Sequence, residues 1–205
     1  MTRPARLRAP GRRASGRGQS LVEFALMLPL MLMILFGMME FGFVFSHHLT
    51  LEYATREGAR LGAALGAGNA DAPCSGTTPE PVDWQIIAAV QRVITSPGSQ
   101  VPPARVSEIR IYKATATGAE TAGVVNVWVP GAGPTVDGVR LQFTPSTTAW
   151  SACGRNSGAS PDSLGISLVY SYRYVTPLGT LMGIMGPATI TISDRTIMAL
   201  NPPAG

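Results

Sequence analysis

A glycine and a glutamate stand five residues apart where a basic leader gives way to a long apolar run. Residues 1–18 contain six arginines and no acidic residue, Gly18 closes this leader, and Glu23 lies just inside the apolar run. A carboxylate in a hydrophobic helix is costly unless it has a partner or a function. We therefore expect charge pairing by Glu23, against the alternative that it reaches the lipid headgroups without a partner.

Glu40 is a second acid in the same run, near its outer end. Two interpretations are equally open for it. Its carboxylate can bind a basic residue or the backbone of a neighbouring subunit, or it can extend to the membrane interface.

The apolar run predicts a membrane-spanning helix over residues 21–45. Residues 24–45 alone would form about 33 Å of helix, enough for the ~30 Å hydrocarbon core. The arginine-rich end is expected in the cytoplasm and the chain after residue 45 outside. A cleavable secretory signal is the competing interpretation, but the run is longer than such a signal needs and no small-x-small site follows it.

The charge of the chain is unevenly distributed. The net charge is +4, from 16 basic and 12 acidic residues. Without the six arginines of the leader, ten basic and twelve acidic residues remain, a net charge of −2. The high isoelectric point thus belongs to the leader, and we expect no nucleic-acid partner.

No pattern in the sequence predicts catalysis, a metal site or a cofactor. The chain lacks a phosphate-binding loop, an HExxH motif and a nucleophile elbow. His47 and His48 are adjacent, so on a helix their side chains point about 100° apart and do not form a chelating pair. We expect both to be polar residues at the membrane interface.

The helix is predicted to continue out of the membrane to residue 66, giving one helix over residues 19–66. Ala54, Gly58, Gly62 and Gly66 recur every four residues and form a stripe of small side chains. Such a stripe allows another helix to approach closely. Alternatively, the glycines only weaken and end the helix.

Cys74 and Cys153 are the two cysteines, and both follow the predicted span. The compartment outside the membrane is oxidising, which favours a disulfide between them. It would close a loop of about 80 residues, worth roughly 4–5 kcal/mol in the chain-entropy model.

Residues 67–205 are predicted to form one extracytoplasmic α+β domain. A short helix is expected from Asp83, as its N-cap, to the Ser96-Pro97-Gly98 stop. Alternating apolar residues predict five strands of an antiparallel sheet packed on the helices. These strands are expected near residues 109–111, 125–129, 139–143, 166–174 and 190–200. Residues 145–163 are expected to form a polar loop; residues 176–188, unusually apolar for a loop, either enter the core or contact a membrane or partner.

Three separated motifs resemble the start of TadE-like proteins of the tight-adherence (Flp, type IVc) pilus systems. They are residues 18–26 (GQSLVEFAL) with Pro29, residues 40–42 (EFG) and residues 54–60 (ATREGAR). The resemblance implies a non-catalytic pseudopilin or minor pilin of the bacterial cytoplasmic (inner) membrane, with the lipid bilayer, other pilins and the pilus assembly platform as partners.

The same resemblance implies cleavage by a prepilin peptidase between Gly18 and Gln19. Glu23 would then be the fifth residue of the mature chain and could neutralise the new amine of Gln19 or that of an adjacent subunit. Two alternatives remain: an envelope scaffold that stays anchored and unprocessed, and an exported binding domain or enzyme whose N-terminus is a signal sequence.

Overall fold

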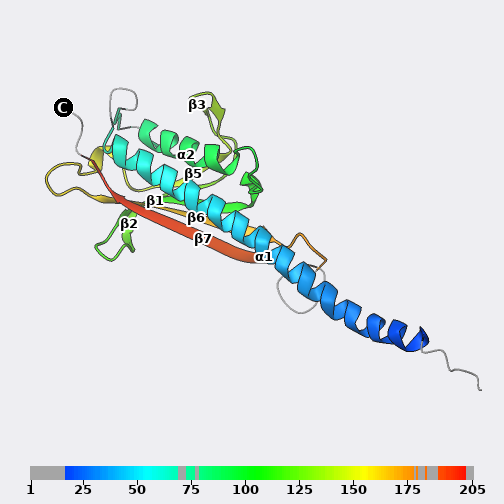
Figure 1. Cartoon of the computed structure of the whole chain (residues 1–205). Coiled ribbons are helices and arrows are strands. Elements are labelled where there is room, and N and C mark those ends of the chain that lie inside the picture. Colours follow the sequence, from blue (N-terminus) through cyan, green and yellow to red (C-terminus); the bar gives the residue numbers. More distant parts are fainter. Residues whose placement is uncertain are drawn as a thin grey trace, which may run out of the picture.

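The protein combines a long N-terminal helix with an antiparallel sheet and a second helix, in an α+β fold (Figure 1). The computed structural model describes residues 17–68, 73–76, 79–177, 179, 183 and 189–201. Most of the 176–188 loop and residues 1–16 of the basic leader therefore lie outside the described residues.

Helix α1 (Arg17–Leu65) has 49 residues and contains Pro29. At 1.5 Å per residue it is about 74 Å long. It begins two residues earlier than predicted, so Gly18 and Gln19 lie in its first turn. Gly66 ends it with φ of 56°, a left-handed conformation that glycine adopts without steric cost, while its N–H donates to Gly62 O over 3.0 Å.

Helix α2 (Pro81–Ile94) starts differently from the prediction. Glu80 is the N-cap residue and Pro81 takes the first helical position, where its missing N–H costs nothing. Asp83 therefore lies inside the first turn and is not the cap. The helix ends as expected before Gly98, whose φ is 91°.

The main sheet has five antiparallel strands in the order β5-β2-β1-β6-β7. A separate pair of short strands, β3 and β4, forms a second sheet. The strands are β1 (Val106–Ala114), β2 (Glu120–Pro130), β3 (Thr135–Val136), β4 (Val139–Arg140), β5 (Phe143–Thr148), β6 (Ser163–Arg173) and β7 (Thr189–Ala199). Two single-turn helices, η1 (Pro103–Arg105) and η2 (Ala152–Gly154), lie in the connections.

The strand expected over residues 139–143 is divided into the short strand β4 and the first residue of β5. Gln91 of α2 explains the break, because its side chain donates to Arg140 O over 2.8 Å and accepts from Gln142 N over 2.7 Å. These bonds satisfy backbone groups that would otherwise need a neighbouring strand. The predicted polar loop over 145–163 is also shorter than expected, because β5 continues to Thr148.

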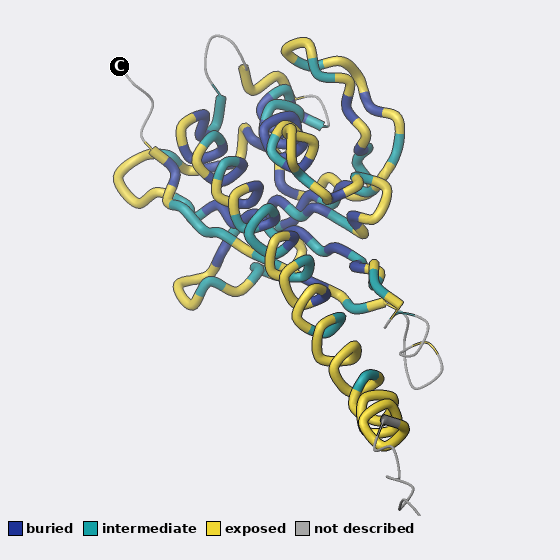
Figure 2. The backbone as a smooth tube through the Cα atoms, turned by 45° about the vertical axis from the view of Figure 1, so that its right-hand side comes forward, coloured by how far each residue is buried: buried dark blue, intermediate teal, exposed yellow. Residues whose placement is uncertain are grey.

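Both helices cover one face of the sheet, and the main core lies between the helices and that face (Figure 1). Ile109, Ile111, Ile166 and Leu168 point into this core and are fully buried, as their alternation with polar residues predicts. The opposite face carries a smaller cluster around Tyr112, whose ring lies over Gly165. The N-terminal half of α1 extends away from this domain, and most of its residues are exposed (Figure 2).

Candidate membrane, processing and docking sites

The predicted processing site lies in the first turn of α1. Gly18 is exposed, and a Cβ atom at this position would meet no atom within 4 Å. A protease that needs an extended backbone must therefore unwind this turn but meets no packing there. The site is open to an enzyme approaching from outside the molecule.

Glu23 lies one turn beyond Gln19 on the same side of α1. Gln19 Nε2 donates to Glu23 Oε1 over 3.1 Å, and both residues are exposed. This spacing would bring the Glu23 carboxylate close to an amine created at residue 19. No basic residue is paired with Glu23 among the described residues, so its carboxylate is accessible to other groups.

The segment of α1 after Glu23 is long and apolar enough to cross a membrane. Its most apolar 18-residue window has a mean hydropathy of 2.3, and none of that window is buried in the protein. The domain does not cover this surface, so only lipid or other proteins could shield it from water. The feature supports a membrane-anchored protein.

Glu40 lies where α1 meets the domain, and it is bound by its own chain. Only 5% of its surface is exposed. Its carboxylate accepts hydrogen bonds from the Tyr172 hydroxyl, from Val175 N over 3.0 Å, and from Thr176 through N over 2.9 Å and Oγ1 over 2.5 Å. Neither interpretation of Glu40 from sequence included these partners, which come from the end of β6 and the residues that follow it.

Tyr172 is suited to donate to this carboxylate. Burial raises the pKa of the Tyr172 hydroxyl, and the hydrogen bond to Glu40 raises it further. The phenol therefore keeps its proton throughout the neutral range. Four donors to one carboxylate fix the sheet to the middle of α1.

His47 is buried, so the expectation that it lies at the membrane interface is wrong. It is 4% exposed and lies between α1 and the sheet. Its ring stacks on Tyr170 with centroids 5.5 Å apart and meets Tyr172 edge-on at 5.0 Å. Its Nδ1 and Nε2 lie 2.7 Å and 3.0 Å from the carbonyl oxygens of Phe43 and Gln100. The domain thus begins to cover α1 at Glu40, before the predicted end of the span at residue 45.

The stripe of small residues faces the chain's own core. A Cβ on Gly58 would lie 2.6 Å from Val90 Cγ2 of α2, and one on Gly62 would lie 3.0 Å from Leu164 Cδ2 and 3.1 Å from Ile86 Cδ1. Ala54 is fully buried. The helix that approaches this stripe is α2 of the same chain, while the last member, Gly66, ends α1 as the other interpretation expected.

These features coincide with a known family over nearly the whole of α1. Residues 18–60 match the TadE-like protein family. The match confirms the resemblance suggested by the three motifs and supports a protein associated with tight-adherence pili. It includes Gly18, Glu23 and Glu40 and ends within α1, before α2 and the sheet begin. No curated protein and no solved structure matches the chain.

Beyond the TadE-like segment, a buried ionic cluster joins α2 to the sheet. Arg155 Nη2 donates to Asp83, and Asn126 Nδ2 donates to the other Asp83 oxygen over 2.8 Å. Asp83 is 1% and Arg155 4% exposed, and the guanidinium lies 4.7 Å from the centre of the Trp150 ring. Burial raises the pKa of Asp83, and the opposing effects of Arg155 and Asn126 lower it.

The sequence predicts a capping role for Asp83 and gives no signal for Arg155 or Asn126. No local signal links them, because 43 residues separate Asp83 from Asn126 and 72 separate it from Arg155. A disulfide between Cys74 and Cys153, with Cα atoms 5.2 Å apart, lies two residues from Arg155. The disulfide and the Arg155–Asp83 ion pair together hold the connection after β5 against the start of α2 and the residues before it.

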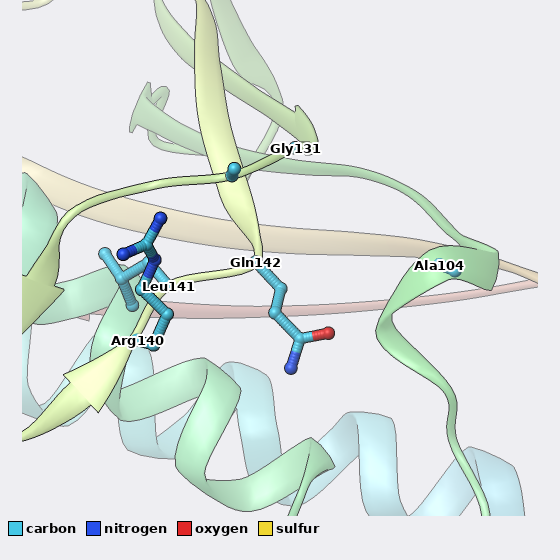
Figure 3. A pocket seen from close by; sticks show the side chains of 6 residues that line it. Ala104, Gly131, Arg140, Leu141 and Gln142 are labelled. Carbon is cyan, nitrogen blue, oxygen red and sulfur yellow. The ribbon is translucent and has the colours of Figure 1, made fainter.

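The domain also has a shallow pocket between the β4–β5 region and η1, with a volume of about 340 Å³ (Figure 3). Arg140 and Gln142 are its polar lining residues, beside Ala104, Gly131, Ala132 and Leu141. This lining contains no acid, histidine or nucleophile that could form a catalytic pair. Within the described part of the chain, no three histidine, cysteine or acidic residues are grouped to hold a metal ion.

Proposed function

We propose that the chain is a non-catalytic TadE-like pseudopilin or minor pilin that takes part in assembly of tight-adherence pili at the bacterial inner membrane. The match of residues 18–60 carries this proposal, because it contains both the processing glycine and the acid that follows it. The exposed apolar segment of α1 supplies the anchor, with the arginine-rich leader in the cytoplasm and the sheet outside.

In this function a prepilin peptidase cuts between Gly18 and Gln19. The cut removes the arginines, each of which favours the anionic cytoplasmic leaflet by about 1 kcal/mol. It also creates an ammonium group one helical turn from Glu23, as the Gln19–Glu23 hydrogen bond supports. At the membrane edge such a pair is screened less than on a wet surface, whether it forms within one chain or between adjacent subunits.

The deciding experiment is the intact mass and N-terminal residue of the protein purified from membranes of its native host. A chain beginning at Gln19 supports pilin-type maturation, and Gly18→Leu should then block it. A chain that retains residue 1 favours the unprocessed scaffold. A start beyond residue 45 refutes the membrane-anchored subunit and favours an exported domain.

The assembly role of Glu23 is tested by Glu23→Ala. Membrane insertion should be unchanged, because the rest of the apolar segment remains, whereas co-purification with other pilins should fall. Glu57→Ala is the matched control, since Glu57 is an acid on the same helix that pairs with Arg60 of its own chain. Equal co-purification of the two variants would contradict charge pairing by Glu23.

A further inference from the structure

The change in burial along α1 fixes the level at which the domain begins. Residues 21–39 have mostly exposed side chains, whereas Glu40 is 5% exposed and His47 4%. Residues 20–39 correspond to about 30 Å of helix, the thickness of the hydrocarbon core. If these residues span the bilayer, Glu40 lies at its outer boundary, and no gap separates the membrane from the domain.

The residues that follow β6 lie beside Glu40, at the same height along α1. Val175 and Thr176 donate their backbone N–H groups to Glu40, and Figure 1 shows the chain after β6 (orange) leaving the sheet beside the middle of α1. Val175 is 63% exposed and Pro177 is also exposed. From Tyr174 to Ser193 the sequence contains no charged residue.

The hydrogen bonds to Glu40 make this segment compatible with a poorly hydrated environment. Irregular backbone is costly at the edge of a bilayer because its N–H groups lose water, unless protein groups replace it. Glu40 provides acceptors for Val175 N and Thr176 N, and these donors in turn satisfy a carboxylate that would be costly there alone. Pro177 has no N–H to satisfy.

Exposed side chains at this level have the chemistry of a membrane interface. Phe41 and Phe45 are 71% and 52% exposed, with ring centroids 6.3 Å apart on α1. Arg173, the last residue of β6, is exposed and forms no ion pair among the described residues. Exposed aromatic side chains near the outer end of the apolar segment, together with an exposed arginine at the end of β6, fit the boundary between acyl chains and phosphate headgroups.

We propose that Val175 and Pro177, in the segment after β6, contact the lipid of the extracytoplasmic leaflet. In this arrangement Arg173 faces the phosphate groups, and Glu40 holds the segment in place through its hydrogen bonds. This inference rests on the proposed membrane anchoring. It assigns residues 20–39 to the hydrocarbon core, a shorter span than residues 21–45, and a lipid-contacting surface to the folded domain.

The test is spin labelling of the full-length protein in liposomes of phosphatidylethanolamine and phosphatidylglycerol. Single cysteines replace Val175, Leu26 in the anchor, and Thr117 in the exposed β1–β2 turn at the other end of the sheet. Oxygen is enriched in lipid and a polar nickel chelate in water. The ratio of a label's collision rate with oxygen to its collision rate with the chelate is therefore higher when the label contacts lipid. Mass spectrometry checks that Cys74 and Cys153 remain bonded.

The Val175 label should give a ratio near that of Leu26 and well above that of Thr117. In a Glu40→Ala background the ratio at Val175 should fall toward the Thr117 value, while Leu26 is unchanged. A Val175 ratio equal to that of Thr117, or a label protected from both reagents by a protein partner, would overturn the inference. A water-like ratio at Leu26 would instead refute the anchoring itself.

Discussion

Gly58→Ala tests whether the stripe of small residues serves the chain's own fold. The new Cβ would lie 2.6 Å from Val90 Cγ2, where carbon atoms at rest are about 3.5–4.0 Å apart. Val90 is fully buried, and a β-branched side chain in a helix has one strongly preferred rotamer. Ile166 lies 3.7 Å from the same position. The strain cannot be relieved by a simple side-chain rotation.

Two opposing effects set the size of the change in stability. Overpacking a buried site costs about 1–3 kcal/mol. Replacing glycine by alanine inside a helix recovers about 0.5–1 kcal/mol. We therefore expect the free energy of unfolding to fall by about 1 kcal/mol, and by at most about 2.5 kcal/mol. Gly42→Ala is the matched control, since a Cβ there meets no atom within 4 Å and should cause no loss.

The assay is urea unfolding in detergent micelles followed by tryptophan fluorescence. The three tryptophans lie at positions 84, 128 and 150, all in the domain, so the signal reports its unfolding. Val90→Ala should partly rescue Gly58→Ala by removing the clashing methyl groups. If Gly58→Ala is as stable as Gly42→Ala, the close approach of α1 to α2 is not formed, and the stripe is available to another subunit.

Three further predictions concern polar contacts of the domain. Glu40→Ala should lower the free energy of domain unfolding by about 3–5 kcal/mol, because it removes the acceptor of four donors, the buried Tyr172 hydroxyl and three partly buried groups of Val175 and Thr176, at up to about 1–3 kcal/mol each. A loss no larger than that of Glu57→Ala, which removes an exposed acid, would contradict this. Arg155→Met should cost about 3–5 kcal/mol by leaving Asp83 buried without its cation, and adding Asp83→Leu should recover part of it in a double-mutant cycle. Burial acts to raise the pKa of Asp162, but the hydrogen bond from the Asn156 backbone and the ion pair with Lys113 outweigh this effect, so that the pKa is lowered. Its stabilisation is thus present above the unfolded-state pKa and lost as pH falls through the lower folded-state pKa. Asp162→Asn should therefore have a lower unfolding midpoint than wild type near pH 7, and the two midpoints should converge as the pH falls below the ordinary pKa of an aspartate.

Local patterns in the sequence predicted most elements correctly. The period-two alternation along residues 166–172 placed Ile166, Leu168 and Tyr170 on the buried face of β6, since successive side chains of a strand point to opposite faces. The 139–143 segment shows the limit of this reasoning. Its alternation continues through Leu141, but Gln91, about 50 residues away, takes the hydrogen bonds that would extend the strand.

Residue type and local spacing alone determined the basic leader, the glycine that closes it, Glu23 one turn beyond Gln19, and the apolar segment of membrane length. These features depend on neighbours along one helix, whose geometry is fixed by its 3.6-residue repeat. The roles of Glu40, His47 and the small-residue stripe were decided by the tertiary structure, because their partners lie far away in the chain. Glu40 bonds to Tyr172 across 132 residues, and such a contact exists only once the sheet has folded onto α1.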